Sequence, residues 1–180
     1  MSCELANGRL EVCKDAVGGI DAIYFINYGS YSYPTDITEV DDVISAVANV
    51  TSLYKYELKG TNSFEQNITS SRENGTTFAE QTLSVILKKQ DATTHKSVKL
   101  LSYGRPHIIV KNRNNQFFLA GLEHGMELTT AAVANGTAMG DLNGYTLTFV
   151  GTEKVLANII DVSTEAALVT AFGSATIVTA

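Results

Sequence analysis

Two runs of alternating apolar and polar residues, separated by Asn74-Gly75, dominate the pattern of the chain. A period of two is the spacing of a β-strand with one buried face. Asn-Gly is the strongest short signal for a two-residue type I′ turn, because both central residues need a positive φ. The sequence therefore predicts one long β-hairpin over residues 54–89, with a first arm at 54–72 and a second at 76–89.

The predicted turn also sets the register of the two arms. Glu73 then faces Thr76, and Phe64 lies opposite Val85. One face of the hairpin is expected to carry the apolar residues, and the opposite face is expected to be polar. The expected packing and turn residues are Phe64, Ile68, Asn74, Gly75, Leu83 and Val85. The expected polar residues are Glu57, Glu65, Asn67, Glu73 and Glu80.

The predicted length of this hairpin is its second notable property. An arm of about 17 residues at roughly 3.3 Å per residue extends about 55 Å, whereas ordinary strands have about 5–6 residues. An isolated two-stranded ribbon is marginally stable in water, and its edges invite pairing with another chain. Two interpretations follow: a mobile surface loop with a short hairpin at its base, or an arm that joins a sheet shared with neighbouring copies.

The remaining patterns predict a mainly β fold with one or two short helices, a β-rich α+β class, in a single domain over residues 1–180. Residues 38–50 are ambiguous: Glu39, Asp41 and Asp42 favour the start of a short helix, whereas the β-branched residues also suit a strand. We favour a short helix or turn there. The other expected strands are 10–15, 20–28, 107–111, 116–120, 126–133, 145–151, 155–162 and 175–180, and the other expected helices are 91–103 and 165–172.

Composition narrows the possible functions. The net charge of −6 argues against a duplex-binding module, which would carry a basic stripe. No apolar run reaches the roughly 18 residues of a transmembrane helix, so no membrane partner is expected. The N-terminal residues lack the basic-then-apolar order of a signal peptide. Without such a signal, Cys3 and Cys13 are expected to be free thiols in a reducing compartment.

No motif for catalysis or cofactor binding stands out. His95, His107 and His124 are isolated from one another, and a metal site at His124 would require carboxylates from distant parts of the chain. No Gly-x-Ser-x-Gly elbow or phosphate-binding loop is present in the sequence. We therefore predict no catalytic residue, no metal site and no cofactor, and we expect a protein that is not an enzyme.

The order of these elements resembles the tail tube proteins of bacteriophages and related contractile injection systems. The resemblance rests on a long hairpin at 54–89, a helix at 91–103, and strands at 107–120 and 126–133. The stretches Gly-Leu-Glu-His-Gly-Met-Glu-Leu at 121–128 and Gly-Asp-Leu-Asn-Gly-Tyr-Thr-Leu-Thr-Phe at 140–149 are also similar to phage virion proteins. The resemblance covers residues 10–151, so residues 153–180 are interpreted as a C-terminal extension.

This resemblance implies a structural subunit with a tail-tube-like β-sandwich or barrel and a protruding hairpin. Such subunits form rings, commonly hexamers, in which the hairpins merge into one β-barrel around a channel. The packing residues above would then face the domain bodies, and Glu57, Glu65, Asn67, Glu73 and Glu80 would line the channel, through which DNA passes without specific binding. The implied partners are further copies of the chain and other tail or neck proteins of the virion, assembled in the host cytoplasm. Neck and terminator rings share this core fold.

A second interpretation belongs to another class of protein. Tyr28 ends the second expected strand, and Tyr31 and Tyr33 follow closely in the connection after it. An exposed platform of aromatic rings would suit a soluble β-sandwich module that binds a carbohydrate or a protein ligand. The same tyrosines would equally cover the edge of a core. Glycan binding that is lost on their substitution would favour the binding module.

Overall fold

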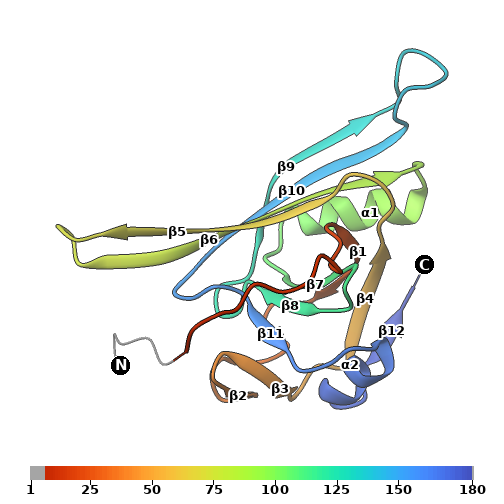
Figure 1. Ribbon diagram of the computed structural model, residues 1–180. Helices are drawn as coiled ribbons and strands as arrows, with labels where there is room; N and C mark the ends of the chain where they lie inside the picture. The colour runs from red at the N-terminus through yellow and green to blue at the C-terminus, as the bar shows by residue number, and fades with distance from the viewer. Residues whose placement is uncertain (1–6, 180) are drawn as a thin grey trace.

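The structure, a computed structural model, describes residues 7–179 as two β-sheets and two short helices (Figure 1). The large sheet has eight strands in the order β12-β4-β1-β7-β8-β11-β3-β2, and the small sheet has four in the order β5-β6-β10-β9. The large sheet contains β1 Ile20–Ile26, β2 Ile37–Val40, β3 Val43–Val47, β4 Ser52–Glu57, β7 His107–Asn112, β8 Phe117–Ala120, β11 Asn158–Ile160 and β12 Thr176–Val178. The small sheet contains β5 Ser63–Ser71, β6 Thr76–Lys88, β9 Glu127–Ala134 and β10 Gly144–Glu153, and the helices are α1 Ala92–Leu101 and α2 Glu165–Ala171.

Two neighbouring interior strands of the large sheet, β1 and β7, are buried on both faces. Tyr24 and Ile109 point into one hydrophobic core, together with Leu168 and Phe172 at α2. Their chain neighbours Ile23 and Ile108 point into a second core on the opposite face of the sheet. Burial on both sides explains why the sequence of β1 is almost continuously apolar.

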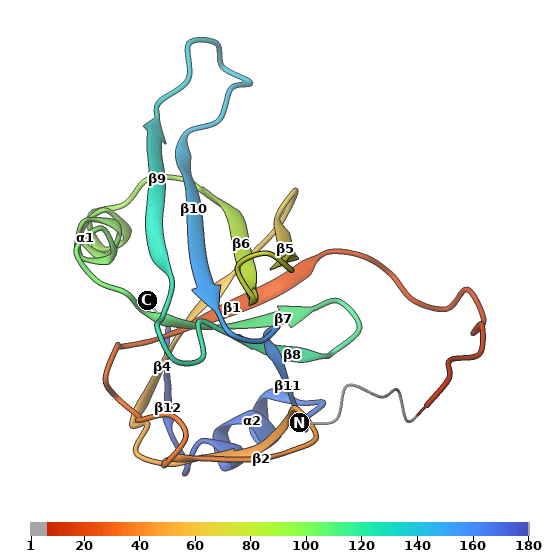
Figure 2. The same cartoon turned by 90° about the vertical axis from the view of Figure 1, so that its left-hand side faces the viewer.

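The second core lies between the large sheet and the small sheet. The ring of Phe25 in β1 lies 5.4 Å from that of Phe149 in β10, and Phe149 is fully buried. Helix α1 closes one side of this sandwich with Val98 (Figure 2). The helix begins after Asp91, whose carboxylate accepts a hydrogen bond of 2.6 Å from the Thr94 amide, as an N-cap residue does.

The packing of the two sheets predicts a large loss of stability in the variant Phe149→Ala. The substitution leaves a cavity between β10 and β1, so we expect it to lower the free energy of unfolding by about 3–5 kcal/mol. Urea denaturation followed by circular dichroism measures the change. The matched control is Phe78→Ala, at a half-buried position near the hairpin tip, and should cost less than about 1 kcal/mol. Equal losses in both variants would contradict the assigned core.

The mainly β class with two short helices is confirmed, but several expected elements are not. Residues 10–15 form no strand, because they are exposed and pair with no other strand. Residues 38–50 form the β2–β3 hairpin and no helix, because Asp41 and Asp42 take φ values of 52° and 62° and make its two-residue turn.

The proposed C-terminal extension is also corrected by the structure. Strand β11 pairs with β8 and β3, and β12 pairs with β4, so residues 158–160 and 176–178 are strands of the large sheet and this part of the chain belongs to the fold. Neither helix of the described chain is long and apolar enough to span a membrane. Cys13 is exposed, and Cys3 lies outside the described residues.

Candidate assembly surface

The small sheet carries the hairpin that the sequence singles out, but the hairpin is shorter than predicted. Its arms are β5, with 9 residues, and β6, with 13. Residues 54–57 belong to β4, which pairs with β1 and β12 in the large sheet. The chain passes from one sheet to the other at residues 58–62, where Leu58 is buried and Gly60 has a φ of 114°. The first arm therefore extends about 30 Å and not 55 Å.

The turn and the register differ from the prediction by two residues. Ser71 pairs with Thr76, which leaves a four-residue turn at residues 72–75. Gly75 takes a φ of 62° in this turn, but Asn74 has no positive φ. A type I′ turn would require a positive φ at both residues, so the turn is of another type. Phe64 consequently pairs with Leu83 and not with Val85. Because the observed register differs from the predicted one by an even number of residues, each residue stays on its predicted face.

The buried face of the small sheet changes the role of two predicted packing residues. Leu83 and Val85 are fully buried in the core of their own chain, so the prediction that they pack against another subunit is wrong. Phe64 is half-buried beside Phe118, with ring centroids 6.5 Å apart. Ile68, farther out on the same face, is 61% exposed, and Asn74 and Gly75 lie in the exposed turn. These three remain accessible to another chain.

The opposite face of the small sheet, here called the open face, is rich in hydroxyl and carboxylate groups. Glu65 pairs with Thr82, and Asn67 pairs with Glu80, so three predicted channel residues share this face and are exposed. Glu127 joins them because it pairs with Val150 on β10. Lys88 is the lysine at the end of β6, and the half-buried Phe78, Ile86 and Val150 interrupt the polar surface. The hydroxyl groups of the open face belong to Ser63, Thr69, Ser71, Thr76, Thr82, Ser84, Thr130, Thr146, Thr148 and Thr152.

Two of the predicted channel residues lie elsewhere. Glu57 ends β4 in the large sheet, and its carboxylate lies 3.5 Å from the ammonium group of Lys55. The prediction that Glu57 shares the polar face of the hairpin is therefore wrong, because the strand break after it places it in a different sheet. Glu73 is exposed in the turn at the hairpin tip.

Both outer edges of the small sheet lack a partner strand within residues 7–179. Strand β5 forms one edge, and β9 forms the other. All residues of β9 are exposed except the half-buried Leu128. Val133 is 48% exposed although it lies on the face that is buried elsewhere in the sheet. Exposed apolar residues on an unpaired edge are typical of a strand that pairs with another chain.

The hairpin tip extends beyond the rest of the small sheet (Figure 1). Strand β10 pairs with β6 only from Lys88 to Ala79. Residues 69–78 therefore form a two-stranded ribbon and its turn. In this ribbon β5 and β6 pair only with each other. At the other end, just before β5 begins, the side chain of Asn62 accepts a hydrogen bond of 2.8 Å from the Ile86 amide of β6.

The three tyrosines do not form an exposed platform. Tyr31 is 6% exposed, and its hydroxyl donates a 2.9 Å hydrogen bond to the carbonyl of Leu122. Burial raises the pKa of Tyr31 above its usual range. Tyr28 stacks on His107 at 5.3 Å, and the Arg105 guanidinium lies 5.0 Å from the centroid of the Tyr28 ring.

The adjoining pocket of about 550 Å³ is consequently shaped by side chains already engaged with the protein. The hydroxyl of Tyr33 donates a hydrogen bond to Glu39, and this bond is the main cause that raises the pKa of Tyr33. His107 is buried with its Nδ1 against the carbonyl of Gly121, and burial lowers its pKa. This arrangement gives the carbohydrate-binding interpretation little support.

Two buried polar side chains, which the sequence analysis did not single out, hold the loop at residues 121–125. The Gln81 side chain accepts a 2.8 Å hydrogen bond from the Gly121 amide. The Glu153 carboxylate accepts hydrogen bonds from the amides of Glu123 and His124, at 3.0 and 2.7 Å. Both residues occupy core-facing positions of their strands, where a polar residue signals an internal binding partner.

The chain was compared with protein-family models, with curated proteins and with solved structures, and none of these comparisons finds a match.

Proposed function

We propose that the chain is a virion structural protein, a ring-forming subunit of a bacteriophage tail tube or neck. The observation that carries this proposal is the small sheet, whose edges at β5 and β9 have no partner strand among residues 7–179. These edges lie at opposite sides of the same sheet, so β5 of one copy can pair with β9 of the next. Such a head-to-tail contact generates a ring when its rotation closes.

The exposed residues around these edges support a shared sheet. Ile68 and Val133 are apolar, exposed, and located on the two edge strands. In a ring, each would be covered by the neighbouring subunit, which removes apolar surface from water. Merging the edges also satisfies the backbone hydrogen-bonding groups that an isolated sheet leaves to solvent. A hexameric ring is the order that we propose.

The open face would then line the channel of the ring. Its charged residues are Glu65, Glu80, Glu127 and Lys88. Three glutamates and one lysine give the open face more negative than positive charge. The hydroxyl groups that surround them are neutral. Affinity for DNA comes chiefly from cations that replace counterions on the phosphates. A face with this charge lets DNA pass without binding it.

The proposed partners and location follow from this role. The subunit would contact copies of itself within a ring and other tail or neck proteins above and below it. It would assemble in the host cytoplasm and end in the tail of the virion. DNA would be the cargo of the channel and not a specifically bound ligand, and the role requires no catalytic residue.

Electron microscopy of the purified chain tests the proposal directly. Because edge pairing is intermolecular, we expect rings or short tubes in negative stain at high protein concentration, and a mass that rises with concentration in light scattering. A reconstruction should place the small sheets of all copies around the lumen. A chain that stays monomeric at every concentration, and that is absent from purified virions, would overturn the proposal.

A further inference from the structure

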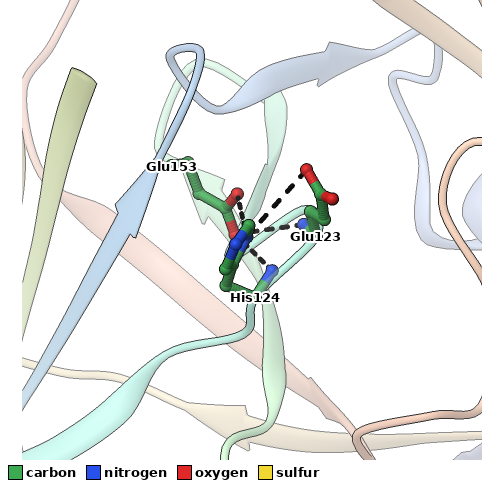
Figure 3. A group of neighbouring side chains, drawn as sticks. All are labelled: Glu123, His124 and Glu153. Carbon is green, nitrogen blue, oxygen red and sulfur yellow. Dashed lines mark hydrogen bonds and ion pairs between the residues drawn. The ribbon is translucent and has the colours of Figure 1, made fainter. Parts of the chain in front are cut away.

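Three side chains with metal-binding atoms converge beside the loop at residues 121–125 (Figure 3). Glu123 and His124 belong to the loop, and Glu153 ends strand β10. The imidazole Nδ1 of His124 lies 3.2 Å from a carboxylate oxygen of Glu153 and 4.0 Å from one of Glu123. The three donor atoms all lie within 4.8 Å of one another. Two ligands of a tetrahedral zinc ion, each about 2.0–2.2 Å from the metal, are about 3.4 Å apart.

The Glu153 carboxylate is fixed in position before any ion binds. Its side chain is 2% exposed. One oxygen, Oε1, accepts the two amide hydrogen bonds from the loop, and this leaves Oε2 directed at the His124 ring. A second shell that orients a ligand in this way raises the affinity of a metal site.

The compensation of the Glu153 charge comes from hydrogen bonds, without a lysine or arginine partner in the described chain. A buried carboxylate requires a positive partner or several hydrogen bonds. Within residues 7–179, no lysine or arginine forms an ion pair with Glu153. Lys154 instead binds Glu123, at 3.0 Å, and this bond lowers the pKa of Glu123. The cluster therefore holds two carboxylates and one lysine ammonium group, which favours a cation.

The cluster is also accessible from solvent. The side chains of His124 and Glu123 are 52% and 36% exposed, in contrast to the buried Glu153. An ion can therefore enter from this side and keep water as its remaining ligand. The Lys154 side chain is 77% exposed, so its ammonium group can leave Glu123 without breaking any packing.

We propose that Glu123, His124 and Glu153 bind a divalent transition-metal ion of the zinc type. One imidazole and two carboxylates are a donor set that zinc accepts, with water in the open position. Magnesium and calcium prefer six or more oxygen ligands and fit this set less well. The ion would join the loop to the end of β10 and stabilise that part of the fold. This site does not depend on the proposed function.

Isothermal titration calorimetry with zinc chloride tests the site on the full chain after removal of chelators and of any affinity tag. We expect one ion per chain, and no comparable heat with magnesium chloride. The variant His124→Ala should bind zinc at least about tenfold more weakly. The matched control His95→Ala, which removes an exposed histidine on α1, should bind zinc as the unmodified chain does.

A second measurement separates zinc binding from a structural role of His124. In the absence of zinc, the thermal unfolding midpoints of the chain and of His124→Ala should be similar, because the His124 side chain is half exposed. Zinc should raise the midpoint of the unmodified chain and of His95→Ala, and not that of His124→Ala. Zinc binding that is absent, or that is equally strong in the chain and in His124→Ala, would overturn the site and leave His124 as a hydrogen-bonding neighbour of Glu153.

Discussion

A chain without the hairpin tip remains folded but forms no rings. The variant replaces residues 69–78 by Asn-Gly, which joins Ile68 to its partner Ala79 through a two-residue turn. The removed residues form a ribbon outside both cores, so we expect the unfolding midpoint to change by only a few degrees. Assembly should fall below detection, because the edge strand β5 loses three of its 9 residues together with the turn. Light scattering and negative-stain microscopy measure the outcome.

Two point variants in the same turn provide graded controls. Gly75 takes a φ of 62°, which a β-branched residue tolerates poorly, so Gly75→Val should distort the turn and reduce assembly. Asn74→Ala keeps an ordinary backbone conformation and should assemble as the unmodified chain does. Rings from the truncated variant, at the same concentration as from the full chain, would show that the tip does not join subunits.

Local signals in the sequence predict much of this fold. The N-cap at Asp91 and Gly104 after the helix locate α1, and alternation locates β10. Two apolar runs on either side of the polar residues 112–115 locate the hairpin β7–β8. The faces of β5 and β6 were predicted correctly even though their register was wrong, because a shift of two residues preserves alternation. Each of these signals lies within a short stretch of chain.

The predictions are wrong where the same local sequence pattern is compatible with two kinds of secondary structure. Tyr54, Tyr56 and Leu58 continue the alternation of β5, so the break at residues 58–62 is visible in sequence only as Gly60. Asp41-Asp42 resembles the acidic start of a helix and instead forms the tight turn of a hairpin. The parallel pairing of β12 with β4 links distant segments and leaves no local signal.

The cluster at Glu153 could be located only in part from the sequence. Tyr145, Leu147 and Phe149 alternate inward along β10, and the same alternation makes Glu153 a carboxylate at a core-facing position. That pattern predicts a buried partner for the carboxylate. It does not identify His124, because the loop at residues 121–125 reaches β10 through tertiary packing.

Reversal of three charges on the open face should convert it from a surface that DNA passes into one that binds DNA. The variant replaces Glu65, Glu80 and Glu127 by lysine, which changes the net charge of the chain from −6 to 0, since each substitution adds two charges. Rings of the unmodified chain should show no affinity for duplex DNA at about 150 mM salt. Rings of the variant should bind, with log K falling by about 0.9 per phosphate contact for each tenfold rise in salt concentration. Filter binding at several salt concentrations measures both.

A second triple variant separates the channel surface from the total charge. Glu11, Asp15 and Asp161 are exposed and lie outside the small sheet, so their replacement by lysine gives the same net charge of 0. If the open face lines the channel, the first variant retains DNA inside the ring and slows its passage, whereas the second binds DNA weakly on the outside. Equal affinity and equal salt dependence in the two variants would mean that total charge alone governs binding. That result would contradict the assignment of the open face to the channel. The small sheet would then have to face the other way in the ring.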